Sequence, residues 1–210
     1  MPRIYHIKHA DTLGGIIKEG GIWCDRECQC RELRGTAVGY THIKERRMRR
    51  SVPLPPRGTL GDYVPFYFAP RSPMLYVIHH GGNPEYDGGQ TPIVHFVSSV
   101  EAVAAARPAL RWLFTDGHAE VALSDYYDDV RKLDEVIDWD VMRSTYWNDT
   151  QQDGDRKRRR QAEFLVHRFL PWELVSTIGV VNRAMADRVE QVLADSRHRP
   201  VVAVAPEWYY

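Results

Sequence analysis

THIKERRMRRSVPLPPRGTLGDYVPFYFAPRSPMLY, residues 41–76, is the stretch that decides how this chain folds, and the rest of the sequence is organised around it. It begins with a dense basic segment, continues through a turn-rich passage of prolines and glycine, and ends in aromatic and apolar residues. Arginines bind anions and aromatic rings stack on bases, so a ligand that carries phosphates and bases needs both side by side. A solvated helix followed by a buried strand is the alternative interpretation of the same residues.

Length, composition and charge point to one compact domain over residues 1–210. The chain is 43% hydrophobic, which is enough to bury a core without disulfides. No apolar run is long enough to cross a membrane, and the first residues lack the apolar core of a signal peptide, so we expect a cytoplasmic protein. The formal net charge is +0, but basic residues crowd 44–57 and 156–160. A neutral protein with such patches can still bind a polyanion locally.

Three cysteines lie close together in the sequence, at Cys24, Cys28 and Cys30. An odd number of cysteines without a signal peptide argues against a disulfide framework. Their C-x3-C-x-C spacing does not match that of zinc sites. We therefore expect reduced thiols and no bound metal.

Periodicity and turn signals predict an α+β fold of short strands and short helices. Asp11 is a plausible N-cap for the first helix, and Ser72 with Pro73 begins a later one. The residues at 25–39 have no clean period and are expected to form a loop. Strands are predicted at 3–9, 22–24, 64–68, 93–98, 112–115, 161–169, 177–181 and 201–205. Helices are predicted at 12–19, 41–50, 73–78, 99–106 and 184–195, with one or two more in the acidic region 116–140.

Glu163 is the acid that the sequence singles out, because it lies in a strand that is otherwise mostly apolar. A carboxylate in that setting is costly unless it is paired or faces a cleft. It is either a fixed anion in a site or an edge-strand acid paired with a nearby arginine. His6 on the first strand and His118 after FTDG are further candidates, although a core histidine and an exposed loop histidine are the alternatives. Fingerprints of Rossmann folds, P-loops, serine hydrolases and zinc proteases do not occur.

Several motifs, spread over nearly the whole chain, match one family. They are IYHI, L-x-x-I-x-x-x-G at 13–20, HIKERR, GTLGDYVPFYFAPRSPMLY, PIVHFVSS, FTDGH, QAEFLV and the terminal WYY. With these motifs in this order, the chain resembles DarT, the DNA ADP-ribosyltransferase toxins of bacterial DarT–DarG toxin–antitoxin systems.

The resemblance implies an ADP-ribosyltransferase-like split antiparallel β-sheet with short helices around an NAD cleft. It implies an enzyme that transfers ADP-ribose from NAD, without a metal, onto a base of single-stranded DNA. One branch of the family modifies thymidine at a ring nitrogen and another modifies guanosine; the QAEFLV and VPFYF blocks look like the thymidine branch. A DarG-like macrodomain antitoxin that removes the mark is the expected partner.

The family pattern also implies site residues. The position of the catalytic arginine depends on the register within HIKERR, because Arg46 and Arg49 lie close to Arg47. The catalytic residues are Arg47, Glu163 and His118, and the NAD-binding residues are Tyr5, His6, Ile7, Gly14, Ile22 and Arg47.

The residue types suit this chemistry. Cleavage of the nicotinamide–ribose bond develops an oxocarbenium-like charge, which the Glu163 carboxylate would stabilise. Arg47 is either an unusually perturbed base or a permanent cation that stabilises the deprotonated nucleobase, since a guanidinium rarely accepts a proton.

The basic segments are expected to contact DNA. The Watson–Crick edge of a base is occupied in a duplex, so an enzyme reaches it either by flipping the base or by acting on a single strand. Residues 25–50 are expected to form the DNA-facing rim, with 156–160 also tracking phosphates. DNA contacts are predicted for Lys44, Arg46, Arg49 and Arg50, and base stacking for Tyr63, Phe66, Tyr67 or Tyr76. The alternatives are a transferase that acts on protein or RNA ends, and a non-enzymatic nucleic-acid-binding domain on the same fold.

Overall fold

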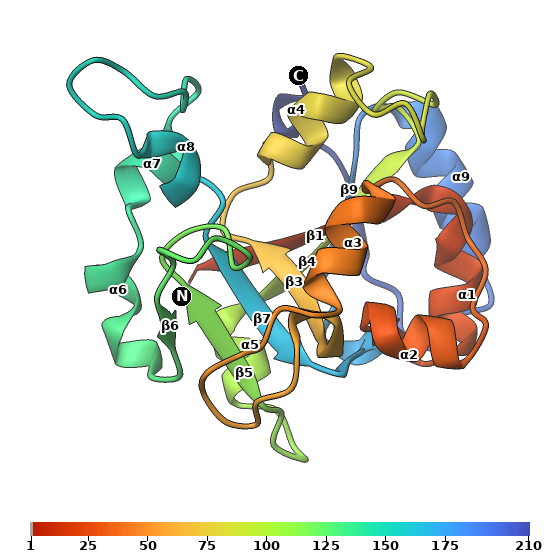
Figure 1. The fold of residues 1–210 in the computed structure, drawn as a ribbon. Helices are drawn as coiled ribbons and strands as arrows, with labels where there is room; N and C mark the ends of the chain where they lie inside the picture. Colours follow the sequence, from red (N-terminus) through yellow and green to blue (C-terminus); the bar gives the residue numbers. More distant parts are fainter. Residues whose placement is uncertain (1) are drawn as a thin grey trace.

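The computed structural model describes residues 2–210, and its central element is an eight-stranded sheet (Figure 1). All the strands predicted from the sequence are present. The stretch 161–169 is interrupted at Arg168, whose φ of 63° is unusual for a residue with a side chain and separates two strands. The strands are β1 (Arg3–His9), β2 (Gly21–Trp23), β3 (Tyr63–Tyr67), β4 (Ile93–Ser99), β5 (Trp112–Thr115), β6 (Tyr126–Tyr127), β7 (Glu163–His167), β8 (Phe169–Pro171), β9 (Thr177–Val180) and β10 (Val201–Val204).

Short helices connect the strands. The predicted helix that follows Ser72 is present, and the Ser72 hydroxyl accepts the Leu75 N–H at 3.2 Å as its N-cap. The helices are α1 (Leu13–Lys18), α2 (Asp25–Cys30), α3 (Thr41–Arg47), α4 (Pro73–His79), α5 (Val100–Ala104), α6 (Leu133–Val136), α7 (Trp139–Arg143), α8 (Arg156–Arg159) and α9 (Arg183–Leu193).

Two sequence predictions were wrong in this part of the molecule. Residues 25–30 are helical, because Asp25 and Glu27 in the first turn favour a helix N-terminus and Glu27 pairs with Arg31 one turn later. Asp11 does not cap α1. Its carboxylate instead accepts the Thr36 backbone N–H at 3.3 Å, which fixes the segment after α2 against the start of the chain.

The sheet has the strand order β10-β9-β4-β1-β3-β7-β5-β6. β9 and β10 are parallel, and the other neighbours are antiparallel. β2 and β8 form a separate antiparallel pair. The predicted α+β class with a mostly antiparallel sheet is therefore confirmed.

The sheet is divided between β1 and β3. All seven residues of β1 pair with β4, but only Tyr5 is in register with a residue of β3, namely Tyr67. β3 then pairs along its whole length with β7. Two half-sheets therefore meet at a single residue pair, and α3 lies in front of the sheet beside β3 (Figure 1). This junction positions the site described below.

Side chains alternate between the two faces of β7, as the two-residue period of a strand requires. Phe164 and Val166 are fully buried in the largest apolar cluster, together with Ala162. Leu165 belongs to a separate cluster with Tyr63 and Leu113. β7 is an interior strand between β3 and β5, so Glu163 at its start is not an edge residue. Within residues 2–210, the helices are too short and too polar to cross a membrane.

Candidate active site

A cavity of about 290 Å³ opens at the junction of the two half-sheets. Its floor is formed by residues of β1, β3 and β7, and its walls by α3, α4 and the segment 36–40. His118, from the loop that follows β5, completes the wall beside Glu163. The volume is near the lower end of the range for small-molecule sites, about 300–1,000 Å³.

A buried ion pair lies in this cavity. Arg47, in the last turn of α3, donates from Nη1 to Oε1 of Glu163 at 3.1 Å. Arg47 Nη2 also approaches Glu163 Oε2 to 2.9 Å, but the two atoms are not aligned for a hydrogen bond. The Arg47 side chain is 9% exposed and that of Glu163 is 3% exposed. Glu163 therefore lines the cavity and is paired, but its partner is the distant Arg47 and its strand is an interior one, so the alternative of an edge-strand acid paired with a nearby arginine was wrong.

The pair keeps both of its members charged. Burial raises the pKa of Glu163, but the charge of Arg47, the nearby His118 and the hydrogen bonds from Arg47 and the Ala119 N–H together outweigh it, so the pKa lies below its ordinary value. Burial alone lowers the pKa of Arg47, and the Glu163 carboxylate more than compensates, so that this pKa is raised. Each charge thus stabilises the other at neutral pH.

Backbone groups fix the Glu163 carboxylate from the other side. The Ala119 N–H donates to Oε1 at 3.0 Å, and the Glu163 N–H donates to the Thr115 hydroxyl at 3.1 Å. That hydroxyl donates in turn to the Gly117 carbonyl at 2.6 Å. The loop between β5 and β6 is therefore attached directly to the carboxylate, and its position determines where Oε2 points.

His6 contributes a neutral imidazole to the floor. Burial is the main reason that its pKa is lowered to about 3. Its Nδ1 lies 2.7 Å from the Pro65 carbonyl oxygen, so in the neutral ring Nδ1 carries the proton and donates, and Nε2 is left as an acceptor. Tyr67, in register with Glu163, also lines the cavity, and burial together with the Glu163 charge raises its pKa.

Several features of the wall fit a nucleotide ligand. Three buried polar atoms, His6 Nε2, Arg47 Nη2 and Glu163 Oε2, lack a hydrogen-bond partner among the residues that the structure describes. Buried polar atoms are normally satisfied, so a ligand with hydroxyl and amide groups would complete them. Lys8, Lys44 and Lys157 bring further positive charge to the same wall, which suits a pyrophosphate.

The structure brings together some of the predicted site residues and not others. His6, Ile7, Arg47, His118 and Glu163 all line the cavity. Three predicted NAD-binding residues lie elsewhere: Tyr5 packs against the Trp208 ring at 5.3 Å between ring centroids, Ile22 is fully buried in the core, and Gly14 is exposed on α1.

The basic arm divides into residues with different surroundings. Lys44 lines the cavity, so it is placed to meet the same ligand as Arg47. Arg46 points away from Arg47 and forms a two-pronged ion pair with Glu120 in the loop after β5. Arg49 is exposed, and Arg50 lines a second cavity. Among the arginines of HIKERR, Arg47 is the one that pairs with Glu163, which favours Arg47 over Arg46 as the counterpart of the family's catalytic arginine.

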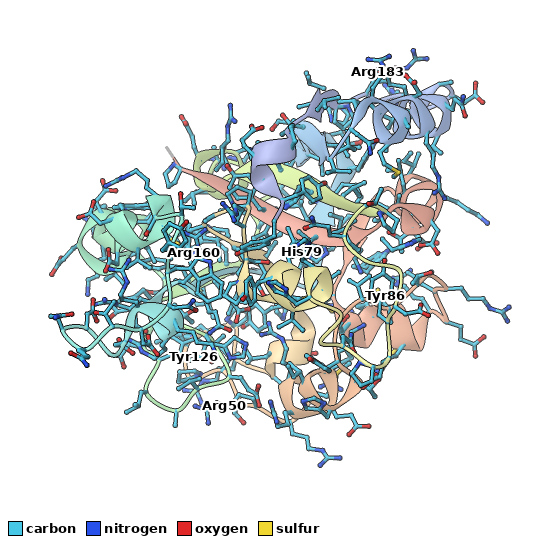
Figure 2. The ribbon with its side chains drawn as sticks, turned by 90° about the horizontal axis from the view of Figure 1, so that it is seen from above. Arg50, His79, Tyr86, Tyr126, Arg160 and Arg183 are labelled. Atoms are coloured by element: carbon cyan, nitrogen blue, oxygen red, sulfur yellow. The ribbon has the colours of Figure 1, made fainter. Side chains whose placement is uncertain are left out.

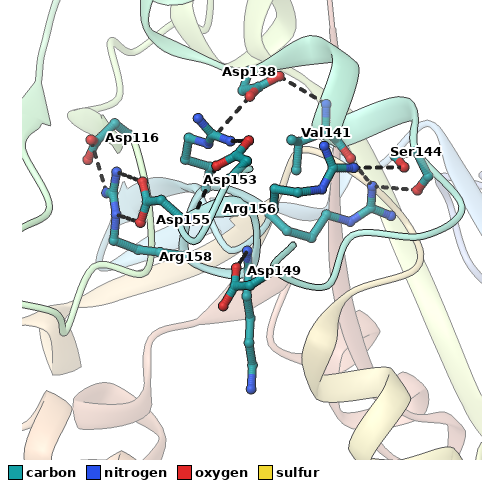
Figure 3. Close-up of polar contacts among 12 residues, drawn as sticks. Asp116, Asp138, Val141, Ser144, Asp149, Asp153, Asp155, Arg156 and Arg158 are labelled. Atoms are coloured by element: carbon teal, nitrogen blue, oxygen red, sulfur yellow. Dashed lines mark hydrogen bonds and ion pairs between the residues drawn. The ribbon is translucent and has the colours of Figure 1, made fainter. Parts of the chain in front are cut away.

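The basic segment 156–160 is mostly used inside the molecule (Figure 3). Arg158 pairs with Asp116 and Asp155, and Arg159 pairs with Asp138 and Asp153. Arg160 is 3% exposed and donates to the carbonyl oxygens of Arg71, Val141, Met142 and Ser144. These arginines therefore hold α7 and the neighbouring loops together, and Lys157 is the member of this segment that reaches the cavity.

The aromatic residues proposed for base stacking also differ from one another. Tyr63 is 1% exposed and Phe66 is fully buried, so neither ring can stack on a base. Tyr67 lines the cavity and Tyr76 is 38% exposed on α4. The aromatic block thus serves mainly as the floor under the site.

Sequence reasoning missed two parts of the wall. Met74, Val77 and Ile78 of α4 and the segment 36–40 enclose the cavity from above. The segment is fixed by Asn83, whose side-chain amide donates to the Val38 carbonyl at 3.1 Å. Gly35 and Gly39 in this stretch were the available sequence signal for a backbone that approaches a ligand closely.

Cys24, Cys28 and Cys30 are free thiols. Among residues 2–210, histidine, cysteine and acidic side chains do not form a group that could hold a metal ion.

Comparison with known proteins places this geometry in context. A family profile described as "ssDNA thymidine ADP-ribosyltransferase, DarT" matches residues 5–210. A "DNA ADP-ribosyl transferase" of Thermus sp. (strain 2.9) is 40% identical over 99% of this chain and 95% of its own length.

Solved structures of Thermus sp. 2.9 DarT also match. Its complex with ADP-ribosylated ssDNA has a TM-score of 0.91 at 38% identity, covering 100% of this chain and 96% of that one. Its complex with NAD+ has a TM-score of 0.87 at 36% identity, covering 100% and 98%.

A more distant relative joins two activities in one chain. It is described as a "DNA ADP-ribosyl transferase-DNA ADP-ribosyl glycohydrolase fusion protein" of Thermosipho africanus (strain H17ap60334). It is 25% identical over 95% of this chain and 47% of its own length. The part of the fusion that matches this chain is thus about half of it.

Proposed function

The chain belongs to the DarT family of DNA ADP-ribosyltransferases, and from that premise we propose that it transfers ADP-ribose from NAD onto a thymidine base of single-stranded DNA. The observation that carries the proposal is the buried Arg47–Glu163 pair in a cavity that is also lined by Lys8, Lys44 and Lys157. All of residues 1–210 form the transferase domain in this proposal. The family profile names thymidine, which favours it over the guanosine alternative.

Glu163 is the residue proposed to stabilise the transition state. NAD supplies the ADP-ribosyl group: its ribose–nicotinamide bond breaks, a ring nitrogen of the base forms the new bond, nicotinamide leaves and the base releases a proton. Positive charge develops on the ribose during this step, and a fixed carboxylate lowers its energy. Glu163 Oε1 accepts hydrogen bonds from Arg47 and Ala119, whereas Oε2 lies 2.9 Å from Arg47 Nη2 without a hydrogen bond, so Oε2 is the oxygen proposed to meet the ribose.

Arg47 is proposed to act as a permanent cation. Its pKa is raised by Glu163, which opposes loss of a proton from the guanidinium and so favours the second of the two roles left open by the sequence. In this role the charge of Arg47 stabilises the deprotonated base as an anion, and water takes the proton. His118, beside Glu163, is proposed as the third catalytic residue.

The remaining wall is proposed to hold NAD. His6 Nε2 is a buried acceptor that suits an amide or hydroxyl donor, and Lys44 and Lys157 suit the pyrophosphate. Ile7 supplies an apolar surface on the floor. Tyr5 and Ile22 do not line the cavity and contribute through packing. Gly14, the remaining residue that the resemblance assigns to NAD, does not line the cavity either.

A DarG-like glycohydrolase is the proposed partner, and the protein is proposed to be the toxin of such a pair. Support comes from the Thermosipho africanus relative, whose description joins the transferase to a DNA ADP-ribosyl glycohydrolase. An enzyme that reverses the mark is the natural antagonist of one that makes it.

The direct test is transfer onto defined oligonucleotides. The protein is mixed with NAD and thymine-only, guanine-only or mixed single strands, and added ADP-ribose is measured by mass spectrometry. We expect an adduct on thymine-containing strands and its loss in Glu163→Ala. An adduct on guanine alone would establish the guanosine alternative. No adduct on any DNA, together with an adduct on RNA ends or protein, would refute DNA as the substrate.

A further inference from the structure

Asp25 is a second carboxylate in the active-site cavity, and the mechanism proposed above does not use it. It is the first residue of α2, it is half-buried, and it lines the cavity beside Trp23 and Cys24. Within residues 2–210 its side chain forms neither a hydrogen bond nor an ion pair. A carboxylate that is partly removed from water is unfavourable without a donor, so a ligand with hydroxyl groups would stabilise it.

Asp25 and Glu163 lie towards opposite ends of the cavity floor. The start of α2 is fixed at the start of β3, because Arg26 pairs with Asp62, the residue before that strand (Figure 1). Glu163 is in register with Tyr67, the last residue of β3. A strand rises about 3.4 Å per residue, so the ends of β3 are roughly 14 Å apart. A ligand with two riboses joined by a pyrophosphate can therefore present one ribose to each carboxylate.

Two lysines without acidic partners flank the Asp25 end of the cavity. Lys8 from β1 and Lys44 from α3 line the cavity, and among the described residues neither forms an ion pair. The charges of both act on the buried thiol of Cys28. Burial is the main reason that the pKa of this thiol is raised; the two lysines oppose that shift and the Asp25 carboxylate adds to it. Two cations and one anion therefore surround the same part of the cavity.

His6 supplies a second acceptor near Asp25. Burial lowers the pKa of His6, and the Asp25 charge partly opposes that shift, so the two side chains lie within electrostatic reach of each other. His6 Nε2 is a buried acceptor without a partner in the described part of the chain. A ribose carries two adjacent hydroxyl donors, and these two acceptors match them.

We propose that Asp25 makes the enzyme specific for NAD against NADP, by accepting a hydrogen bond from the 2′-hydroxyl of the adenosine ribose and repelling the phosphate that NADP carries at that oxygen. The inference rests on the proposed function, because it presumes NAD in this cavity with its nicotinamide ribose at Glu163. The adenosine ribose is then the one that meets Asp25. Like charges held together in a binding site are strongly unfavourable, so the carboxylate excludes the 2′-phosphate. Without it, Lys8 and Lys44 would attract that phosphate.

Wild-type protein alone tests the specificity. ADP-ribosyl transfer to a thymine-containing oligonucleotide is measured with NAD, with NADP and with NAD that lacks the 2′-hydroxyl of its adenosine. We expect kcat/KM to be at least about 100-fold lower with NADP than with NAD, because of charge repulsion. We expect it to be about tenfold lower with the deoxy analogue, which cannot donate to the carboxylate.

Substitution of Asp25 tests whether this residue is the cause. Asp25→Asn removes the charge and should lower the preference for NAD over NADP by at least about tenfold, through a gain with NADP. Asp25→Ala should treat NAD and the deoxy analogue alike. Glu27→Gln is the matched control, because Glu27 is an acid in the same turn of α2 that pairs with Arg31 and Arg168 and does not line the cavity. It should keep both wild-type ratios. A ratio of two substrates in one preparation is independent of the folded fraction, so it separates specificity from stability.

The lysines are tested in the Asp25→Asn background. Addition of Lys8→Ala should abolish the gain with NADP. Addition of Arg183→Ala should retain it, because Arg183 is a cation on α9, at the edge of the molecule opposite Arg50 (Figure 2), and does not line the cavity. Equal use of NAD and NADP by wild type, or an unchanged ratio in Asp25→Asn, overturns the inference alone. Absence of transfer by wild type with NAD overturns the proposed function instead.

Discussion

Glu163 and Arg47 are 116 positions apart in the sequence, yet their side chains approach to 2.9 Å inside a cavity. Glu163 begins the interior strand β7, and Arg47 is the last residue of the short helix α3. The cavity that contains them opens where the two half-sheets meet at one residue pair, Tyr5 with Tyr67. Burial makes each charge depend on the other, and the following predictions test that dependence.

Removal of the Glu163 charge should stop transfer. We expect Glu163→Gln, which keeps the shape of the side chain, to lower kcat for ADP-ribosyl transfer by at least about 100-fold, a typical cost of losing one transition-state contact. Its affinity for NAD, measured by calorimetry, should change far less. Because the pKa of Glu163 lies below its ordinary value, wild-type kcat should persist as pH falls through the usual glutamate range. An acid limb at an ordinary glutamate pKa would contradict this.

Removal of Arg47 alone should destabilise the fold. Arg47→Met leaves the Glu163 carboxylate buried without its cation, and breaking a buried pair in this way costs about 3–5 kcal/mol. The double variant Arg47→Met/Glu163→Gln should regain most of that loss, because no charge is left unpaired. The free energy of unfolding from urea titrations measures both effects. Equal stability of the single and double variants would show that the pair is not energetically coupled.

Two buried histidines should make the protein sensitive to acid. Burial lowers the pKa of His6 from 6.5 to about 3 and that of His95 from 6.5 to about 4. Between pH 6.5 and the lowered pKa of each histidine, the unfolded chain binds a proton that the folded chain excludes. The free energy of unfolding therefore falls as pH drops below 6.5. Each histidine contributes about 1.4 kcal/mol per pH unit. His6→Gln should show a shallower loss in urea titrations at pH 5, whereas exposed His42→Gln should follow wild type.

Arg160 should be a structural residue despite its position in a basic run. Its guanidinium holds carbonyl oxygens of α7 and of the turn before α4, and burial lowers its pKa only to about 10, so it stays charged. Arg160→Met should lower the free energy of unfolding by about 3–5 kcal/mol. Lys157→Met, exposed in the same run, should leave it within about 0.5 kcal/mol of wild type. Similar losses in both would contradict the assignment.

Lys44 and Arg49 should affect different substrates although they share the basic arm. Lys44 lines the cavity and Arg49 is exposed outside it. Lys44→Ala should therefore raise the KM for NAD, and Arg49→Ala should raise the KM for the oligonucleotide, each by about threefold to tenfold for a single charge contact. Steady-state kinetics with each substrate varied separately gives both constants. An effect of Lys44→Ala confined to the oligonucleotide would contradict its position in the cavity.

Local sequence was enough to predict most of the secondary structure. Alternation along residues 163–167 separates Phe164 and Val166 from Leu165, and the structure buries them in different clusters. Ser72 and Pro73 identify the start of α4, because a side-chain N-cap contacts a backbone N–H only three residues away and is therefore a local signal. The prediction of a loop at 25–39 was wrong for α2, because residues 25–30 have no apolar period. That helix is stabilised instead by the acids in its first turn and by the pair of Glu27 with Arg31.

The sequence by itself determined the fold class, the family and the candidate acid, because apolar periodicity and long motifs are properties of neighbouring residues. The tertiary structure alone decided which charges meet. It directs Arg47 into the cavity and Arg46 towards Glu120, and it commits Arg160 to the interior, although all three are arginines in basic runs. Ion pairs form between side chains that the chain brings together from distant positions, so their partners cannot be derived from local sequence.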